Sequence, residues 1–208
     1  MKKLRKLVLL MCLLVTTGGF GFEVPSMTKP PIIDGRIGTA EWQDALLISG
    51  AGRKIDPRRA QIYAAWDKSH LYLAMRSEVP PHSAPVVTEN SLGPVMDDSL
   101  ELWFAPPEKG RDQEAAKFGQ FQLIANSRGN CYQMHHNPGY GLPAKAWNAE
   151  VKIANTVHDG VWDMEIAIPA AAFGFSGLKP AIWKILPVRN FRTPPGGQNP
   201  FTDCNGFM

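Results

Sequence analysis

The sequence has few cysteines and lacks an apolar run long enough to cross a membrane. Three cysteines in 208 residues exclude a densely disulfide-bonded small domain. The main apolar run, residues 7–15, has nine residues, whereas a helix needs about 20 to span the roughly 30 Å hydrocarbon core of a bilayer. No internal repeat or low-complexity tract is present either, so one domain is predicted.

The chain also has no large excess of positive or negative charge. The chain has 22 Lys plus Arg and 19 Asp plus Glu, for a formal charge of +3. Four of the cations precede the apolar run, which leaves 18 against 19, or −1, in the rest of the chain. No basic run or stripe remains. Nucleic-acid binding therefore has no electrostatic footprint, and we expect no nucleic-acid partner.

The N-terminal residues 1–21 have the three parts of a secretory signal peptide. A positive segment precedes the apolar run of residues 7–15, and small residues follow up to Gly21. The sequence thus predicts a secreted or periplasmic protein with a mature domain from residue 22 to 208 that does not associate with the membrane and is monomeric. An uncleaved membrane anchor is the alternative. A lipoprotein is disfavoured, because Cys12 lies inside the apolar run behind Met11.

Removal of this segment leaves two cysteines, Cys131 and Cys204. An even pair in an exported protein allows a disulfide but does not require one. Two free thiols are the alternative.

Motifs for catalysis are absent. The chain has no Gly-x-Ser-x-Gly, His-Glu-x-x-His or phosphate-binding loop. Asp97 and Glu101 share a strand face, but at about 3.3 Å per residue they lie roughly 13 Å apart, beyond the about 5–9.5 Å of a glycosidase pair. His135 and His136 are adjacent in a predicted strand, so their side chains point to opposite faces. These features predict a protein that is not an enzyme.

Alternation with the strand period of two dominates the remaining sequence. An Asp-Gly pair at residues 159–160 is a strong hairpin signal. Short helical turns are predicted after Thr39 and from Pro169 to Phe173. The predicted fold is an all-β antiparallel β-sandwich, immunoglobulin-like or jelly-roll-like, with one or two short helices. Its predicted strands are residues 60–66, 71–78, 99–104, 118–125, 131–135, 147–157, 161–168 and 184–189.

One long segment, residues 79–97, contains four prolines and a glycine at Gly93, which predict that it has no regular structure. Loops of this length are usually functional or disordered. The segment is therefore either the wall of a binding site or a loop without function.

Five short motifs resemble, in order, those of family 9 carbohydrate-binding modules and their DOMON-like relatives. Together they span residues 32–190 and cover most of the mature chain. They are Ile33-Asp34-Gly35; Ala40-Glu41-Trp42; Ala65-Trp66-Asp67 with Leu71-Tyr72-Leu73; Asp98-Ser99-Leu100-Glu101-Leu102; and Gly160-Val161-Trp162 with Glu165 and Ile168-Pro169.

The resemblance implies a non-catalytic β-sandwich that binds glycan chains, typically at their ends, in an extracellular polysaccharide-degradation context. Glu101 stands at the family's ligand-binding glutamate, Gln122 where the family has an arginine, and Asn190 at an amide position. The two tryptophans that clamp the sugar ring fall on Val95 and Phe201. Only Phe201 can still stack on a ring, so weak binding is expected.

Other aromatic residues could replace the lost clamp. The candidates are Trp103, Tyr140 and Trp147, for which packing against the sheets is the alternative. The family also binds calcium, and Asp97 and Asp98 could hold such a structural ion through oxygen ligands. A pair of solvated charges is the alternative for them.

Two further readings stay open. DOMON-like sandwiches include haem-b electron-transfer domains, so iron could be held by Met75, Met96 or Met164 with His70 or Lys145. A surface scaffold without sugar affinity is the other reading. The family normally continues with one more strand, so this chain is expected to lack the family's last strand, which would leave a neighbouring strand with an unpaired edge.

Overall fold

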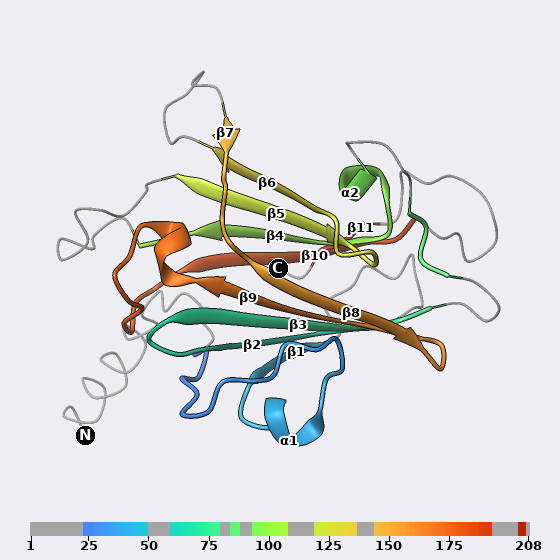
Figure 1. The fold of residues 1–208 in the computed structure, drawn as a ribbon, viewed down its shortest axis with the longest axis horizontal. Helices are drawn as coiled ribbons and strands as arrows, with labels where there is room; N and C mark the ends of the chain where they lie inside the picture. The colour runs from blue at the N-terminus through green and yellow to red at the C-terminus, as the bar shows by residue number, and fades with distance from the viewer. Residues whose placement is uncertain are drawn as a thin grey trace, which may run out of the picture.

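The computed structural model describes residues 23–49, 59–79, 84–87, 93–107, 119–136, 144–192 and 204–206. In these residues two antiparallel sheets pack face to face as a sandwich (Figure 1). The predicted all-β sandwich is confirmed.

The first sheet has five strands. In spatial order they are β1 (Leu46–Ser49), β2 (Ala60–Trp66), β3 (His70–Glu78), β9 (Val161–Pro169) and β8 (Lys152–His158). The second sheet has six: β11 (Cys204–Gly206), β10 (Lys184–Asn190), β4 (Ser99–Ala105), β5 (Gln120–Asn126), β6 (Cys131–His136) and β7 (Lys145–Ala146). Three short helices accompany them: α1 (Thr39–Trp42), α2 (Gly93–Met96) and the 3-10 helix η1 (Ala170–Phe173).

Alternation along the strands fills the space between the sheets. Leu71, Leu73 and Met75 of β3 are buried in the same core cluster as Leu100 and Leu102 of β4, on the sides that the sequence pattern predicts. Burial of such rows is the main force that holds the two sheets together. Larger side chains complete the core at one end, namely Phe104, Phe121, Trp147 and Phe173.

The turn between β8 and β9 has the predicted form. His158 pairs with Val161, so only Asp159 and Gly160 form the loop. Both have positive φ, 46° and 75°, as the type I′ turn requires. The Asp-Gly signal is thus sufficient to locate this hairpin.

Several local predictions were wrong. Helix α2 lies in the segment expected to lack regular structure, because Pro94 stands at the helix start, where no N–H is needed. Gly38, rather than Thr39, occupies the N-cap of α1, without a side-chain cap. β8 begins only at Lys152. The short strands β1, β7 and β11 carry no periodic signal, and they form by pairing with longer neighbours.

Cys131 and Cys204 belong to strands of the six-stranded sheet that are not neighbours. Cys131 lies in β6 and Cys204 in β11, and β5, β4 and β10 lie between them. Four spacings of about 4.8 Å separate the two strands by roughly 19 Å, whereas bridged Cα atoms lie within about 7 Å. Cys131 is a free thiol, and burial raises its pKa to about 11.

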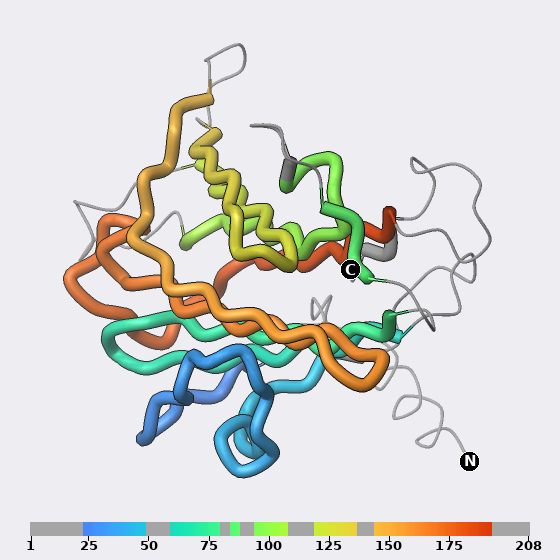
Figure 2. Tube along the Cα trace, turned by 45° about the vertical axis from the view of Figure 1, so that its right-hand side comes forward, coloured from blue at the N-terminus to red at the C-terminus, as the bar shows by residue number. Residues whose placement is uncertain are grey.

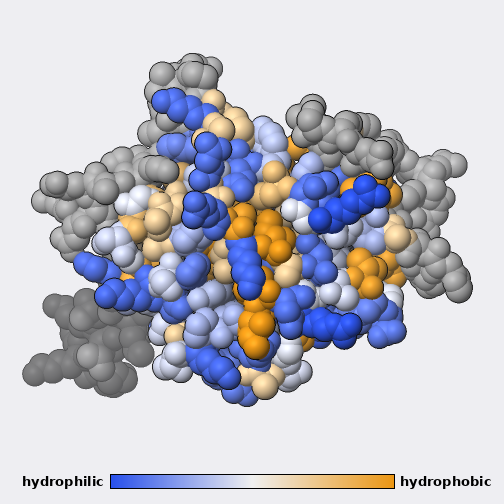
Figure 3. All heavy atoms as spheres, viewed as in Figure 1, coloured by the Kyte–Doolittle hydropathy of each residue, from blue (hydrophilic) through white to orange (hydrophobic). Residues whose placement is uncertain are grey.

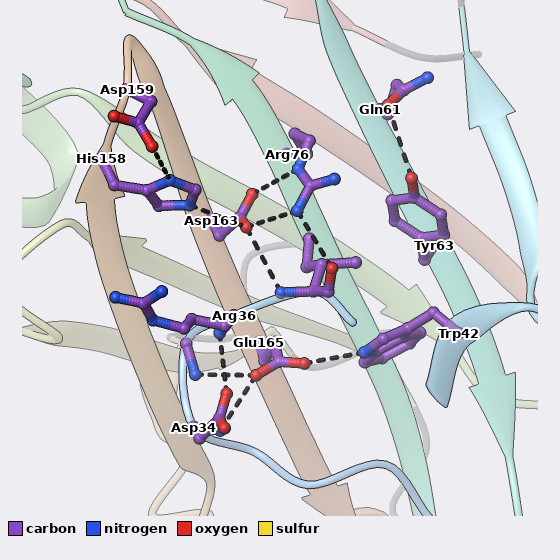
Figure 4. Close-up of polar contacts among 12 residues, drawn as sticks. Asp34, Arg36, Trp42, Gln61, Tyr63, Arg76, His158, Asp159, Asp163 and Glu165 are labelled. Atoms are coloured by element: carbon purple, nitrogen blue, oxygen red, sulfur yellow. Dashed lines mark hydrogen bonds and ion pairs between the residues drawn. The ribbon is translucent and has the colours of Figure 1, made fainter. Parts of the chain in front are cut away.

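The N-terminal residues 33–42 form a strap across the outer face of the five-stranded sheet (Figure 4). Buried Glu165 of β9 accepts hydrogen bonds from the N–H groups of Asp34 and Gly35, at 3.0 and 2.8 Å, and from Trp42 Nε1 at 2.8 Å. The motifs around Gly35, Trp42 and Glu165 therefore meet in one structural contact. These motif residues hold the strap on the sheet, so their resemblance indicates the fold.

The surface in the view of Figure 1 is largely hydrophilic, with a short apolar band across its middle (Figure 3). Large apolar side chains that are exposed include Ile32 and Val157. In the part of the chain that the structure describes, no helix is long and apolar enough to cross a membrane.

Candidate functional site

The candidate site lies on the outer face of the six-stranded sheet. Residues paired directly across antiparallel strands project to the same face. Trp103 of β4 pairs with Gln122 of β5, and Ser99 of β4 pairs with Asn190 of β10. Glu101 lies between Ser99 and Trp103 on the same side of β4. The structure thus brings Glu101, Gln122 and Asn190 onto one face.

Glu101 is the centre of a hydrogen-bond cluster. Its Oε1 accepts from Trp103 Nε1 and from Gln122 Nε2, both at 2.7 Å. Its Oε2 accepts from Asn190 Nδ2 at 3.1 Å. An ionised carboxylate can accept about four hydrogen bonds, so these three leave capacity on Oε2. The carboxylate is held in place yet can still receive a hydroxyl group.

Two further side chains, Trp103 and His136, join the cluster. Both are half-buried, and their ring centroids lie 5.0 Å apart with planes 31° apart. His136 Nε2 lies 3.0 Å from Gln122 Oε1. The two rings belong to β4 and β6, so an aromatic surface adjoins the Glu101 carboxylate.

From the sequence, Trp103 is a candidate for the lost clamp with sheet packing as its alternative, and His136 is considered only as half of a histidine pair. The signal for Trp103 was present, because it is two residues from Glu101 in one strand. Spacing within one strand could not predict His136, because only the pairing of β5 with β6 brings it next to Gln122. His135 points to the other face and stacks on Phe121 at 4.4 Å.

Helix α2 and apolar side chains of the same sheet face lie beside the cluster. Helix α2 contacts β5 and β6 and lies beside the end of the sheet where these strands turn (Figure 2). It carries Val95, which is half-buried, and Met96, which is 40% exposed. Other residues of the same face are Ile124, Tyr132, Met134, Leu186 and Val188.

The other predicted aromatic residues are Phe201, Tyr140 and Trp147. Phe201 and Tyr140 lie outside the described residues. Trp147 is buried at 2% exposure in the core, where its Nε1 donates to the Ala172 carbonyl oxygen at 2.8 Å. Packing, rather than a binding platform, is therefore the role of Trp147.

Among the described residues, no second carboxyl group is hydrogen-bonded to Glu101. Its direct cross-strand neighbours are Ile124 and Val188, which carry no titratable group. In the described part of the chain, Glu101 bonds only to donors of Trp103, Gln122 and Asn190. Every described hydrogen bond to the Glu101 carboxylate therefore comes from a neutral donor.

Asp97 and Asp98 are both fully buried, so they are not a pair of solvated charges. Asp98 accepts hydrogen bonds from the N–H groups of Val86 and Arg192 and pairs with Arg189. Asp97 accepts from the amide of Asn126. Calcium requires six to eight oxygen ligands, and no group of three metal-binding acidic, His or Cys side chains occurs among the described residues. Arg189 and two N–H groups already occupy the Asp98 carboxylate, and the calcium site stays a prediction.

Three of the residues considered for haem, Met75, Met164 and His70, do not meet at one site. Met75 and Met164 pair across β3 and β9 in the filled core, both at 0% exposure. His70 stacks on Tyr72 at 5.8 Å outside that core. These residues do not fit a haem pocket.

Comparison with protein families and curated proteins finds no match to a family model and no matching curated protein. Solved structures do match. A family 9 carbohydrate-binding module from Caldicellulosiruptor kristjanssonii in complex with glucose is 15% identical, with a TM-score of 0.55 over 80% of this chain and 77% of the module. The fold is similar to that of family 9 carbohydrate-binding modules.

Two more structures agree. The Caldicellulosiruptor kristjanssonii module in complex with cellotriose is 15% identical, with a TM-score of 0.55 over 81% of this chain and 76% of the module. A proposed carbohydrate-binding protein from Bacteroides uniformis ATCC 8492 is 12% identical, with a TM-score of 0.59 over 88% and 89% of the two chains. The fold inferred from the motif resemblance is thereby confirmed.

Proposed function

We propose that this chain is a non-catalytic carbohydrate-binding protein whose site is the cluster of Glu101, Trp103, Gln122, His136 and Asn190. The observation that carries the proposal is the Glu101 carboxylate, fixed by three donors beside a half-exposed indole on one sheet face. The similar fold of sugar-bound family 9 modules supports it.

The chemistry of the cluster suits a pyranose. The apolar C–H face of the ring packs on an aromatic surface, while the hydroxyls donate to a carboxylate and accept from amides. Trp103 supplies the aromatic surface, and Glu101 and Gln122 supply the polar groups. Glucose and cellotriose, the ligands in the similar structures, are the first sugars to test.

Affinity is expected to be weak, in the range of about 0.1–1 mM, or roughly −4 to −5.5 kcal/mol. The family position on α2 is Val95 rather than a tryptophan. One stacking face is therefore lost relative to a two-tryptophan clamp.

Titration calorimetry with glucose, cellotriose and other oligosaccharides tests the proposal. Glu101→Ala and Trp103→Ala should each abolish measurable binding with little loss of stability, because both residues lie outside the core. Glu150→Ala is the control, since Glu150 is exposed and outside the cluster. Unchanged affinity in Glu101→Ala would place any sugar elsewhere. A negative glycan array would favour the scaffold reading.

We further propose that the protein does not hydrolyse glycans itself and acts beside enzymes that do. The absence of a carboxylate partner across the strands from Glu101 supports this. Incubation of the purified protein with a panel of polysaccharides should release no reducing sugar. Steady release would overturn the proposal.

Export is part of the same proposal. The charged segment and apolar run of residues 1–21 support cleavage by a signal peptidase. Mass spectrometry of protein recovered from outside the cytoplasm should find an N-terminus between about Gly19 and Val24. An intact Met1 on a soluble cytosolic protein would contradict export.

A further inference from the structure

The side-chain amide of Gln122 is held between two groups on neighbouring strands. Its Nε2 lies 2.7 Å from Glu101 Oε1, and its Oε1 lies 3.0 Å from His136 Nε2. Glu101 belongs to β4 and His136 to β6, so the amide spans β5 from one neighbour to the other. Its orientation depends on both.

The chemistry of the carboxylate fixes the direction of this chain of hydrogen bonds. An ionised carboxylate only accepts, so Gln122 must turn its NH₂ group toward Glu101. The reverse orientation would place two acceptor oxygens 2.7 Å apart without a proton between them. The carbonyl oxygen of Gln122 then faces His136, whose Nε2 must carry a hydrogen.

We infer that His136 is a positioning residue that determines the specificity of the carbohydrate site. As an Nε2–H donor it locks the Gln122 amide, and the site then offers a carboxylate acceptor on Glu101 next to an amide donor on Gln122. The ligand that fits is a pyranose with two neighbouring hydroxyls, one donating to Glu101 and the other accepting from the second N–H of Gln122. This inference rests on the proposed function.

The contact between His136 and Trp103 decides which variants are informative. The two rings lie 5.0 Å apart, so removal of the imidazole would disturb the aromatic surface as well as the hydrogen bond. His136→Phe keeps a ring and removes only the donor. His136→Gln keeps a donor that can reach Gln122. Gln120→Ala is the matched control, because Gln120 is exposed and pairs with His136 without a bond to Gln122.

Two measurements test the inference. In the free protein, ¹⁵N NMR should place the hydrogen of neutral His136 on Nε2. Calorimetry should show that His136→Phe weakens sugar binding about five- to tenfold, as expected for one lost hydrogen bond. The variant should also discriminate less between the sugar and its deoxy analogue that lacks one of the two hydroxyls. His136→Gln should restore most of the affinity and most of the discrimination. Gln120→Ala should bind sugar as the unaltered protein does.

Failure of this inference differs from failure of the proposed function. A hydrogen on Nδ1, or full affinity and discrimination in His136→Phe while Glu101→Ala loses binding, would overturn the role of His136 alone. If the unaltered protein binds no sugar, the proposed function and the role of His136 in specificity are both wrong. Thermal unfolding of His136→Phe at the temperature of the unaltered protein would show that a loss of binding is local.

Discussion

Arg189 and Asp98 form an ion pair inside the sandwich, with 3.0 Å between Nη2 and Oδ1 and no more than 2% of either side chain exposed. Arg189 also donates from Nε to Ser77 Oγ of β3 at 3.0 Å. Its guanidinium lies 4.7 Å from the ring centroid of Trp162 in β9. One side chain of β10 therefore ties the six-stranded sheet to the five-stranded sheet, one residue before Asn190 of the candidate site.

Loss of this tie should be costly. Arg189→Met removes the cation beside a buried carboxylate, and breaking a buried pair from one side typically costs about 3–5 kcal/mol. The free energy of unfolding in urea measures it. Arg36→Ala is the control, because Arg36 is exposed and its change should stay within about 0.5 kcal/mol. A loss below about 1 kcal/mol in Arg189→Met would show that packing alone holds the sheets together.

Gly35 and Gly129 distinguish two reasons why a position requires glycine, which are a positive φ and a lack of space for a Cβ. Both have positive φ, 88° and 79°. A Cβ at Gly35 would lie 2.7 Å from the backbone carbon of Asn155, whereas at Gly129 the nearest atom, Asn155 Nδ2, is 3.7 Å away. Gly129→Ala should cost about 1–2 kcal/mol from its backbone conformation. Gly35→Ala adds a clash with the backbone of β8, so its cost should be larger by about 1–3 kcal/mol.

Urea unfolding of both glycine variants gives the comparison. Equal losses would mean that the strap moves away from β8 at little cost. In that case the strap, and with it the contact of Glu165 with the Gly35 N–H, would be more loosely held than the hydrogen bonds indicate.

Asp163 should make the fold sensitive to acid. Burial raises the pKa of this carboxyl, but the hydrogen bonds and charge of Arg76, with His158 and the Ile37 N–H, lower the pKa more, so it ends below its usual range. Its folded pKa is thus below the unfolded value of about 3.9. The stability it contributes is present above about pH 4 and is lost as pH falls through the folded pKa.

Asp163→Asn should therefore unfold at lower urea concentration at pH 7 and show a smaller further loss at pH 3. Asp159→Asn is the control, because the Asp159 side chain is 96% exposed, and its profile should match the unaltered protein. A steeper loss of Asp163→Asn in acid would contradict the sign of the shift. Glu165 acts in the opposite direction, since burial raises its pKa and its contribution is lost as pH rises through the folded value.

Val95→Trp should tighten sugar binding. Val95 is half-buried on α2, at the end of the face that carries Glu101, and an indole there adds a stacking surface worth about 1 kcal/mol, or roughly fivefold in Kd. Calorimetry with the best sugar measures the change. Val95→Leu is the control, which adds apolar bulk without a ring. Equal gains in both variants would indicate general hydrophobic contact rather than stacking.

Much of the fold follows from local sequence. The period-two rows that place Leu71, Leu73 and Met75 inward depend only on strand geometry. The Asp159–Gly160 turn depends only on the positive φ that these residues tolerate. The outward position of Glu101 follows from the same alternation in β4. These features need no knowledge of which strands become neighbours.

Only the tertiary structure decided the rest. His136 reaches Gln122, and Gln122 reaches Glu101, because β6, β5 and β4 pair in one particular register, and a slip of one residue would turn every side chain to the other face. Asp97 and Asp98 look like solvated charges in the sequence, yet both are buried in the folded chain, Asp98 with Arg189 as its partner and Asp97 with Asn126. The sequence alone determined which residues face outward on each strand. Long-range strand pairing determined which of them meet, because register is fixed by contacts between segments far apart in the chain.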